Sequence, residues 1–308
     1  MEIALQFVLL ALGFVMLGKG ADWFVEGAAG IAMRFGIPQL VIGLTIVAMG
    51  TSAPEAAVSI AAAMKGNADI TIGNIVGSNI LNILIILGLA ASIIPIAVAR
   101  STVRIEIPFM IGVTALLFYQ GRDGSISLAD GGVLMVAFAA YMMYLYTMAM
   151  KSNVDSDLEE PGLPLGRCLL GAVGGLALII AGSNVTVGAA TSIATYAGLS
   201  ERFIGLTIVA LGTSLPELFT SVAAARRGNA DIAIGNIVGS NIFNILFVVG
   251  LSSLIIDIPF ASAFNFDTYV ALGAAVLLWL CVLRTQRLQR WAGALMLVCY
   301  AAYLGYIL

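Results

Sequence analysis

The stretch IGLTIVAMGTSAPEAAVSIAAAMKGNADITIGNIVGSNILNIL, residues 42–84, decides the fold of this chain. It returns at residues 204–246 as IGLTIVALGTSLPELFTSVAAARRGNADIAIGNIVGSNIFNIL, with 33 of 43 positions identical and no gap between the copies. Self-similarity of this length is the signature of an internally repeated architecture. Close helix packing would explain the shared Gly and Ala residues. It does not explain why the polar residues are shared as well, so the repeat points to a duplicated site.

The composition around the repeat is that of an integral membrane protein. Of the 308 residues, 61% are hydrophobic and only 10% are charged, whereas a soluble domain carries about 25% charged residues. So little charge excludes an ordinary soluble enzyme, a disordered protein and a nucleic-acid-binding protein. The apolar residues form long blocks instead of alternating, which favours spanning helices over an outer-membrane barrel.

Ten apolar stretches are long enough to be considered as membrane spans. The first and the sixth exceed the roughly 20 residues that a bilayer needs, so we expect them to be tilted, or bent near Gly18–Gly20 and Gly182. The ten stretches are residues 3–33, 38–64, 69–95, 103–119, 127–150, 166–196, 200–225, 231–256, 267–283 and 290–307.

A polar, acidic segment with two prolines, KSNVDSDLEEPGLPLGR at 151–167, divides these spans into five and five. Because an odd number of spans separates the two copies of the repeat, the second copy should be inverted relative to the first. We therefore predict an all-α membrane protein of ten transmembrane helices built from two inverted-topology five-helix repeats. The expected parts are residues 1–150 with the repeat at 39–90, a linker at 151–165, and residues 166–308 with the repeat at 201–252.

The distribution of basic residues predicts the orientation in the membrane. If the N-terminus lies outside, ten Lys and Arg residues fall in cytoplasmic loops and only three in external loops. Cytoplasmic loops are generally enriched in these residues. We therefore expect both termini outside, on the periplasmic side, and the linker 151–165 in the cytoplasm.

A glutamate lies midway along an apolar span in each copy, within GTSAPE (50–55) and GTSLPE (212–217). A carboxylate at membrane depth is expensive and marks a functional site by default. The proline before it removes one helical N–H and clashes with the carbonyl four residues back, so we expect a bend at Gly50 and Gly212 with freed carbonyls. Carboxylate, hydroxyl and carbonyl oxygens suit sodium, magnesium and calcium. A proline kink with protonated, paired glutamates is the structural alternative. The side chains concerned are Thr51, Ser52, Glu55, Thr213, Ser214 and Glu217.

The next span of each half carries a polar stripe, within GNIVGSNILN (73–82) and GNIVGSNIFN (235–244). Spacing of four residues places the stripe on one helix face, and its members are Asn74, Ser78 and Asn82, repeated as Asn236, Ser240 and Asn244. Asn79 and Asn241 lie about 100° around the helix. They could line the site or pack against a neighbouring helix. In the first span, Lys19, Asp22 and Glu26 share one face and could pair with one another.

Two inverted copies of GTSxPE followed by GNxxGSNxxN resemble the α-repeats of the sodium/calcium exchanger branch of the cation/calcium exchanger superfamily. The resemblance covers the ten-span plan and is most specific over residues 39–90 and 201–252. The short linker is similar to that of prokaryotic members, which implies the plasma (inner) membrane. The resemblance implies a secondary antiporter that exchanges calcium for sodium by alternating access, surrounded by the lipid bilayer. No cofactor and no obligate protein partner is implied.

In that family, cation sites cluster at mid-membrane between the second, third, seventh and eighth spans. Glu55 and Glu217 match the family's site glutamates. Asn244 stands where some members have an acid, which removes one possible charge. The other matched hydroxyl, carbonyl and amide ligands are Ala48, Thr51, Ser52, Ser78, Asn82, Ala210, Thr213, Ser214 and Ser240.

Charge counting on this site predicts electrogenic exchange. Two ionised glutamates balance one Ca²⁺, whereas three Na⁺, the usual family ratio, would leave one net positive charge. The resemblance also implies that the first and sixth spans slide as a pair against the other eight.

Other functions remain open from the sequence. The same glutamates could titrate in a calcium/proton exchanger, another divalent cation could be the substrate, and a passive cation channel is a remote alternative. An enzyme is not expected. The chain has no histidine, which excludes Ser-His and Cys-His catalysis, and the duplicated mid-span acids are not the aspartates of an aspartyl protease.

Overall fold

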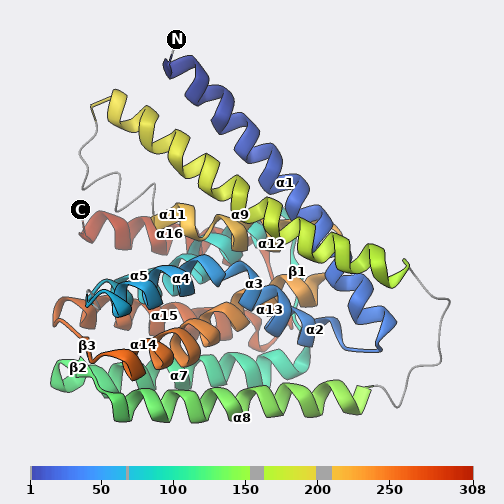
Figure 1. Cartoon of the computed structure of the whole chain (residues 1–308). Helices are drawn as coiled ribbons and strands as arrows, with labels where there is room; N and C mark the ends of the chain where they lie inside the picture. Colours follow the sequence, from blue (N-terminus) through green and yellow to red (C-terminus); the bar gives the residue numbers. More distant parts are fainter. Residues whose placement is uncertain (1, 67–68, 153–162, 199–209, 308) are drawn as a thin grey trace.

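Figure 1 shows the computed structural model of the chain, which describes residues 2–66, 69–152, 163–198 and 210–307. The regular secondary structure of this part is helical apart from four two-residue strands. Eight of its helices are long and apolar enough to cross a membrane, and a bent pair of helices would make a ninth. The expected span at 200–225 lies partly outside the described residues. The chain is therefore a multi-pass helical membrane protein.

The elements of the first half follow the expected spans. They are α1 (Glu2–Arg34), α2 (Gln39–Ile42), the π-helical η1 (Gly43–Val47), α3 (Ala48–Thr51), α4 (Ala53–Met64), α5 (Asp69–Leu81), the π-helical η2 (Asn82–Leu87), α6 (Gly88–Ile93), β1 (Ile96–Ala97), the π-helical η3 (Thr102–Glu106), α7 (Ile107–Gln120), the 3₁₀ turn η4 (Gly121–Asp123), β2 (Ser125–Ile126) and α8 (Leu128–Ser152).

The described helices of the second half follow a similar order. It contains α9 (Leu165–Tyr196), α11 (Ala210–Thr213), α12 (Leu215–Arg226), α13 (Ala230–Phe243), the π-helical η6 (Asn244–Val249), α14 (Gly250–Ile255), β3 (Ile258–Pro259), α15 (Ala263–Leu283), β4 (Arg287–Leu288) and α16 (Arg290–Ile307). π-helical turns are rare and often mark functional sites. Both η2 and η6 begin at the last asparagine of the polar stripe.

Helices α1 and α9 form a long, tilted pair that crosses the rest of the molecule (Figure 1). With 33 and 32 residues, each measures about 50 Å, against a hydrocarbon core of about 30 Å. Both helices run obliquely to the other helices in Figure 1. Both also continue as unbroken helices through Gly18–Gly20 and Gly182, so no helix break marks the expected bend.

The glycines of α1 and α9 bring the two backbones into contact. A Cβ added at Gly20 would lie 2.9 Å from the carbonyl oxygen of Gly175, and one added at Gly182 would lie 3.0 Å from the amide nitrogen of Leu17. Small residues allow such close packing in membranes, where helices associate through van der Waals contact. Gly20 and Gly182 therefore lie in the seam of the pair, whereas a Cβ added at Gly18 would have nothing within 4 Å.

Two small strand pairs connect the halves. β1 pairs antiparallel with β4, with Ile96 opposite Leu288, and β2 pairs antiparallel with β3, with Ile126 opposite Ile258. In Figure 1, β2 and β3 lie at the side where the N- and C-termini are, and the facing ends of α8 and α9 lie at the opposite side. Each half thus contributes one strand to each pair.

The seam between α1 and α9 predicts opposite effects for two neighbouring glycines. A Cβ at Gly175 would lie 2.5 Å from the amide nitrogen of Phe24, whereas one at Gly174 would have nothing within 4 Å. We expect Gly175→Ala to lower the free energy of unfolding by about 1–3 kcal/mol through overpacking. The matched control Gly174→Ala should raise it by up to about 1 kcal/mol, because alanine favours the helix. Thermal unfolding of the detergent-solubilised protein checks this, and equal effects of the two substitutions would contradict it.

Candidate functional site

The bent pair of helices carries the first copy of the glutamate motif, GTSAPE (50–55). Helices α2 to α3 and helix α4 meet at an angle of 51°. The break falls at Ser52, whose backbone leaves the helical region with φ −83° and ψ 5°, and not at Gly50 as the sequence suggested. Pro54 lies in the first turn of α4, where its missing N–H is not needed. This places Glu55 in the first turn of α4, where 1% of it is exposed.

The second motif, GTSLPE, forms the same break between α11 and α12. Ser214 has φ −92° and ψ 5°, Pro216 lies in the first turn of α12, and Glu217 follows it. Glu217 is also 1% exposed. Both glutamates are therefore buried at the start of a helix, where the helix dipole favours a negative charge.

Each glutamate is bound by a serine from the other copy of the motif. The Ser52 hydroxyl donates to Glu217 Oε1 at 2.8 Å, and the Ser214 hydroxyl donates to Glu55 Oε1 at 3.4 Å. The two helix breaks therefore face each other, and one cluster contains both carboxylates. The sequence predicted the four residues, and the structure brings them together.

The first asparagine of each polar stripe holds the glutamate helix in place. Asn74 Nδ2 donates to the Ser59 hydroxyl at 2.9 Å and to the backbone oxygen of Glu55 at 3.3 Å. Asn236 Nδ2 makes the same two contacts with the Ser221 hydroxyl, at 2.9 Å, and with the backbone oxygen of Glu217, at 3.4 Å. These serines were not singled out from the sequence, although Ser occupies this position in both copies.

Four amides link α5 and η2 to α13 and η6 in a reciprocal network. Asn79 Nδ2 donates to the backbone oxygen of Asn241 and Asn241 Nδ2 to that of Asn79, each at 3.2 Å. Asn82 Nδ2 donates to Asn241 Oδ1 at 2.8 Å, and Asn244 Nδ2 donates to Asn79 Oδ1 at 3.1 Å. Of the two roles left open for Asn79 and Asn241, contact with a neighbouring helix is the one the structure shows.

The other candidate residues lie around the breaks. The Thr51 hydroxyl is 3.0 Å from Asn236 Oδ1, and Ser240 donates to the backbone oxygen of Ala48 at 3.4 Å. Ala48 O also accepts the Ser52 N–H. Ser78 is buried in α5, and Thr213 is half-buried at the end of α11, directly before Ser214. Ala210 is the first residue of α11.

Four buried carboxylate and amide oxygens in this region accept no hydrogen bond from any residue that the structure describes. They are Glu55 Oε2, Glu217 Oε2, Asn82 Oδ1 and Asn244 Oδ1. Buried acceptors normally have a partner, since an unsatisfied one costs about 1–3 kcal/mol. Helix α4 packs against η6 and helix α12 packs against η2, so these oxygens belong to elements in mutual contact. Carboxylate and amide oxygens are the kind of hard ligand that binds calcium in proteins.

Sequence reasoning missed two buried polar residues, one at a helix break and one away from it. Ser183 of α9 donates to the backbone oxygen of Gly212 at 2.7 Å, which is a carbonyl freed by Pro216. The equivalent position in the first half holds Ala21, which has no hydroxyl, so comparison of the two halves could not single out Ser183. Glu106 is a third fully buried carboxylate and accepts a hydrogen bond from the Tyr144 hydroxyl. Its repeat mate is Thr268, so it too lacks the duplication.

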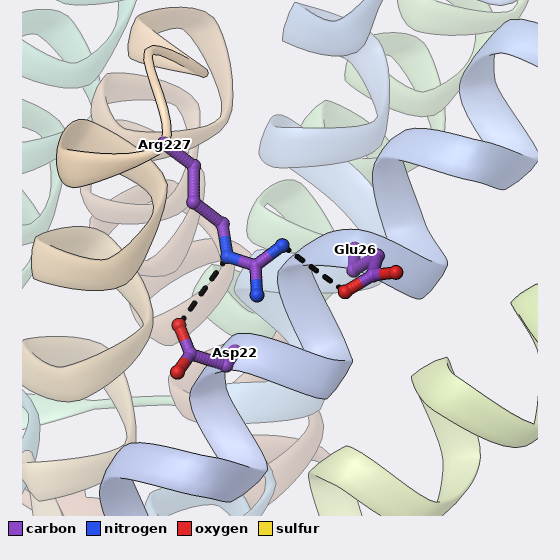
Figure 2. A network of polar contacts seen from close by, with 3 residues as sticks. All are labelled: Asp22, Glu26 and Arg227. Carbon is purple, nitrogen blue, oxygen red and sulfur yellow. Dashed lines mark hydrogen bonds and ion pairs between the residues drawn. The ribbon is translucent and has the colours of Figure 1, made fainter.

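An ion-pair network joins α1 to the end of α12 (Figure 2). Arg227 lies directly after α12, and its Nε is 3.3 Å from Asp22 Oδ1 while its Nη1 is 3.1 Å from Glu26 Oε2. The expected pairing of Asp22 and Glu26 with Lys19 is therefore corrected: these acids pair across helices. The counterpart network, between α9 and the end of α4, would lack both acids, because the positions equivalent to Asp22 and Glu26 hold Asn184 and Gly188.

Comparisons with known proteins agree on one family. The family model described as "Sodium/calcium exchanger protein" matches residues 5–147 and again residues 168–308. The chain is 40% identical over 314 residues to a putative antiporter, CaxA, of Alkalimonas amylolytica, covering 98% of each chain. It is 33% identical over 345 residues to the sodium/calcium exchanger MaX1 of Methanosarcina acetivorans, again covering 98% of each.

Comparison of the fold with solved structures points to the same family. A solved structure of the sodium–calcium exchanger NCX_Mj, soaked with 2.5 mM Na⁺ and 10 mM Sr²⁺, superimposes with a TM-score of 0.86 at 34% sequence identity, covering 98% of this chain and 99% of that one. The two family matches, one for each half, fall on the two copies of the buried Ser–Glu motif. On these grounds the chain belongs to the sodium/calcium exchanger family of membrane antiporters.

Proposed function

We propose that this protein exchanges calcium for sodium across the membrane, moving calcium out against entering sodium by alternating access. The observation that carries the proposal is the pair of cross-bonds Ser52–Glu217 and Ser214–Glu55. They unite two buried carboxylates from the two copies of the repeat in one cluster. Two fixed negative charges inside a membrane protein need cations, and a site shared by two halves can be opened from either side.

The proposed ligands are oxygens from both helix breaks and both polar stripes. The glutamates supply charge, the hydroxyls and backbone carbonyls supply neutral oxygens, and the asparagines supply amide oxygens. Support comes from the burial of the cluster and from its four oxygens that lack a partner within the described chain. The proposed set is Ala48, Thr51, Ser52, Glu55, Ser78, Asn82, Ala210, Thr213, Ser214, Glu217, Ser240 and Asn244.

The proposed architecture is ten transmembrane helices in two inverted five-helix repeats, at residues 1–150 and 166–308 with the linker 151–165 between them. Many secondary transporters use this plan, with the site at the repeat interface. It is supported by reciprocal contacts such as those of Asn79 and Asn241, 162 positions apart, and by strand pairs that each combine the two halves. We place both termini on the periplasmic side of the inner membrane and the linker in the cytoplasm.

Helices α1 and α9 are the proposed moving pair. Their glycine seam holds them to each other, while their links to the other helices include two polar contacts that differ between the halves. Ser183 binds the freed carbonyl of Gly212, and Arg227 binds Asp22 and Glu26. The exposed ion pair contributes roughly 0–1 kcal/mol, which is small enough to break during a transport cycle.

Neutralising either glutamate should abolish exchange. We expect Glu55→Gln and Glu217→Gln each to reduce calcium uptake into sodium-loaded vesicles to the level of vesicles without protein, because one carboxylate cannot balance Ca²⁺. The measurement is uptake of labelled calcium on imposing an outward sodium gradient. Asp123→Asn, which changes an exposed carboxylate in the turn η4, serves as the control and should leave uptake unchanged. Wild-type rates in either glutamine variant would contradict the proposal.

Exchange of three Na⁺ for one Ca²⁺ should respond to voltage. In sodium-loaded vesicles one net positive charge leaves per cycle, so an inside-positive potential should drive calcium accumulation. Each 100 mV adds about 2.3 kcal/mol per charge, which is about 50-fold in the calcium ratio at equilibrium. Clamping the potential with potassium and valinomycin measures this. Accumulation that ignores the potential would refute electrogenic exchange.

The same vesicles separate the alternatives. Uptake driven by a pH gradient in sodium-free buffer would identify a calcium/proton exchanger instead. Calcium currents that need no counter-ion would identify a channel.

A further inference from the structure

We propose that Asn79 and Asn241 are positioning residues that turn the amide oxygens of Asn244 and Asn82, respectively, toward the transported cation. The inference rests on the proposed function, since it concerns the ligands of the same site. In this proposal Asn79 and Asn241 do not touch the cation, but they orient the residues that bind it. The argument follows from which atoms can donate and which can only accept.

The orientation of Asn79 and Asn241 is fixed by backbone. Asn79 Nδ2 lies 3.2 Å from the backbone oxygen of Asn241, and Asn241 Nδ2 lies 3.2 Å from that of Asn79. A carbonyl oxygen can only accept, so each side chain must present its NH₂ group there. The assignment of oxygen and nitrogen in an asparagine normally depends on its network, and here the network ends on two backbone atoms. The Oδ1 atoms of both residues must therefore point elsewhere.

Those two oxygens in turn fix the orientation of the next pair of amides. Asn79 Oδ1 is 3.1 Å from Asn244 Nδ2, and Asn241 Oδ1 is 2.8 Å from Asn82 Nδ2. Rotating the amide of Asn82 or Asn244 by 180° would set two oxygens face to face and lose the bond. Each of these residues therefore offers NH₂ to its neighbour and holds its Oδ1 away from it.

The oxygens held away are the ones that the cation would need. Asn82 Oδ1 and Asn244 Oδ1 are buried and have no hydrogen-bond partner among the described residues, and the same holds for Glu55 Oε2 and Glu217 Oε2. The segments η2 and η6, which begin with Asn82 and Asn244, pack against α12 and α4, which carry the glutamates. A flipped amide would present N–H donors to a cation, which repels them.

The network also holds α5 against α13, so packing alone must be distinguished from positioning. Interhelical polar contacts in membranes are worth about 0.6 kcal/mol on average. Both roles predict that Asn79→Ala lowers the melting temperature. Only positioning predicts that the effect on cation affinity depends on which residue stands at 244.

The test is a mutant cycle on calcium uptake into sodium-loaded proteoliposomes. We expect N79A to raise the KM for calcium about 10-fold or more, as loss of an outer-shell partner typically does. In the N244D background, a carboxylate has oxygens on both sides and needs no orienting amide, so N79A should change KM less than about 3-fold. The matched control is the N82D background, where N79A should keep its full effect because Asn82 is held by Asn241.

The same cycle can be run on the other pair, with N241A in the N82D and N244D backgrounds, and it replaces the first if N79A fails to fold. A KM ratio for N79A that is the same in the wild-type, N244D and N82D backgrounds would overturn positioning and leave packing as the role. In that case sodium-driven uptake by the wild type would still support the proposed function. Absence of uptake by the wild type would overturn both.

Discussion

The structure depends on two carboxylates that lie inside a membrane protein and are each bound by a serine of the opposite helix break. A carboxylate at this depth is costly unless protein groups or cations compensate it. Ser52 and Ser214 compensate part of the charge through one oxygen of each glutamate. The second oxygen of each has no hydrogen-bond partner among the described residues, and in the proposed function it binds the cation. The rest of the central architecture places these groups: proline-started helices bring the glutamates inward, and the asparagines of the stripes fix the helices around them.

The molecule combines a nearly symmetric centre with an asymmetric periphery. Contacts of Asn74, Asn79 and Asn82 recur at Asn236, Asn241 and Asn244 with closely similar distances. In the part of the chain that the structure describes, the contacts that Ser183, Asp22 and Glu26 make with the remaining helices do not recur. The equivalent positions hold Ala21, Asn184 and Gly188, which have different chemistry. A symmetric centre suits a site that must look alike from both sides. An asymmetric periphery suits different stabilities for the two states of a transport cycle.

The repeat made much of the site predictable. Identity between the copies singled out Ser52, Glu55 and Asn82 and the equivalent residues of the second copy. The contacts across the two copies became visible only in the structure, where the copies face each other. The position of the helix break, at Ser52 and not at Gly50, was harder to predict from the sequence, because it depends on the residue at which helix α4 begins. Arg227 could not be matched to Asp22 and Glu26 from the sequence, since they are about 200 residues apart and only packing brings them together. Ser183 and Glu106 lie outside the repeated stretch. The equivalent positions of the other half hold Ala21 and Thr268, so identity between the halves could not single these two residues out.

The most direct test of the central claim is to locate a bound divalent cation. Crystals soaked in strontium, which replaces calcium and scatters anomalously, would show where the cation lies. The account predicts an anomalous peak between the carboxylates of Glu55 and Glu217, lost on soaking with high sodium. A peak remote from both glutamates, or no peak in crystals that diffract well, would contradict it.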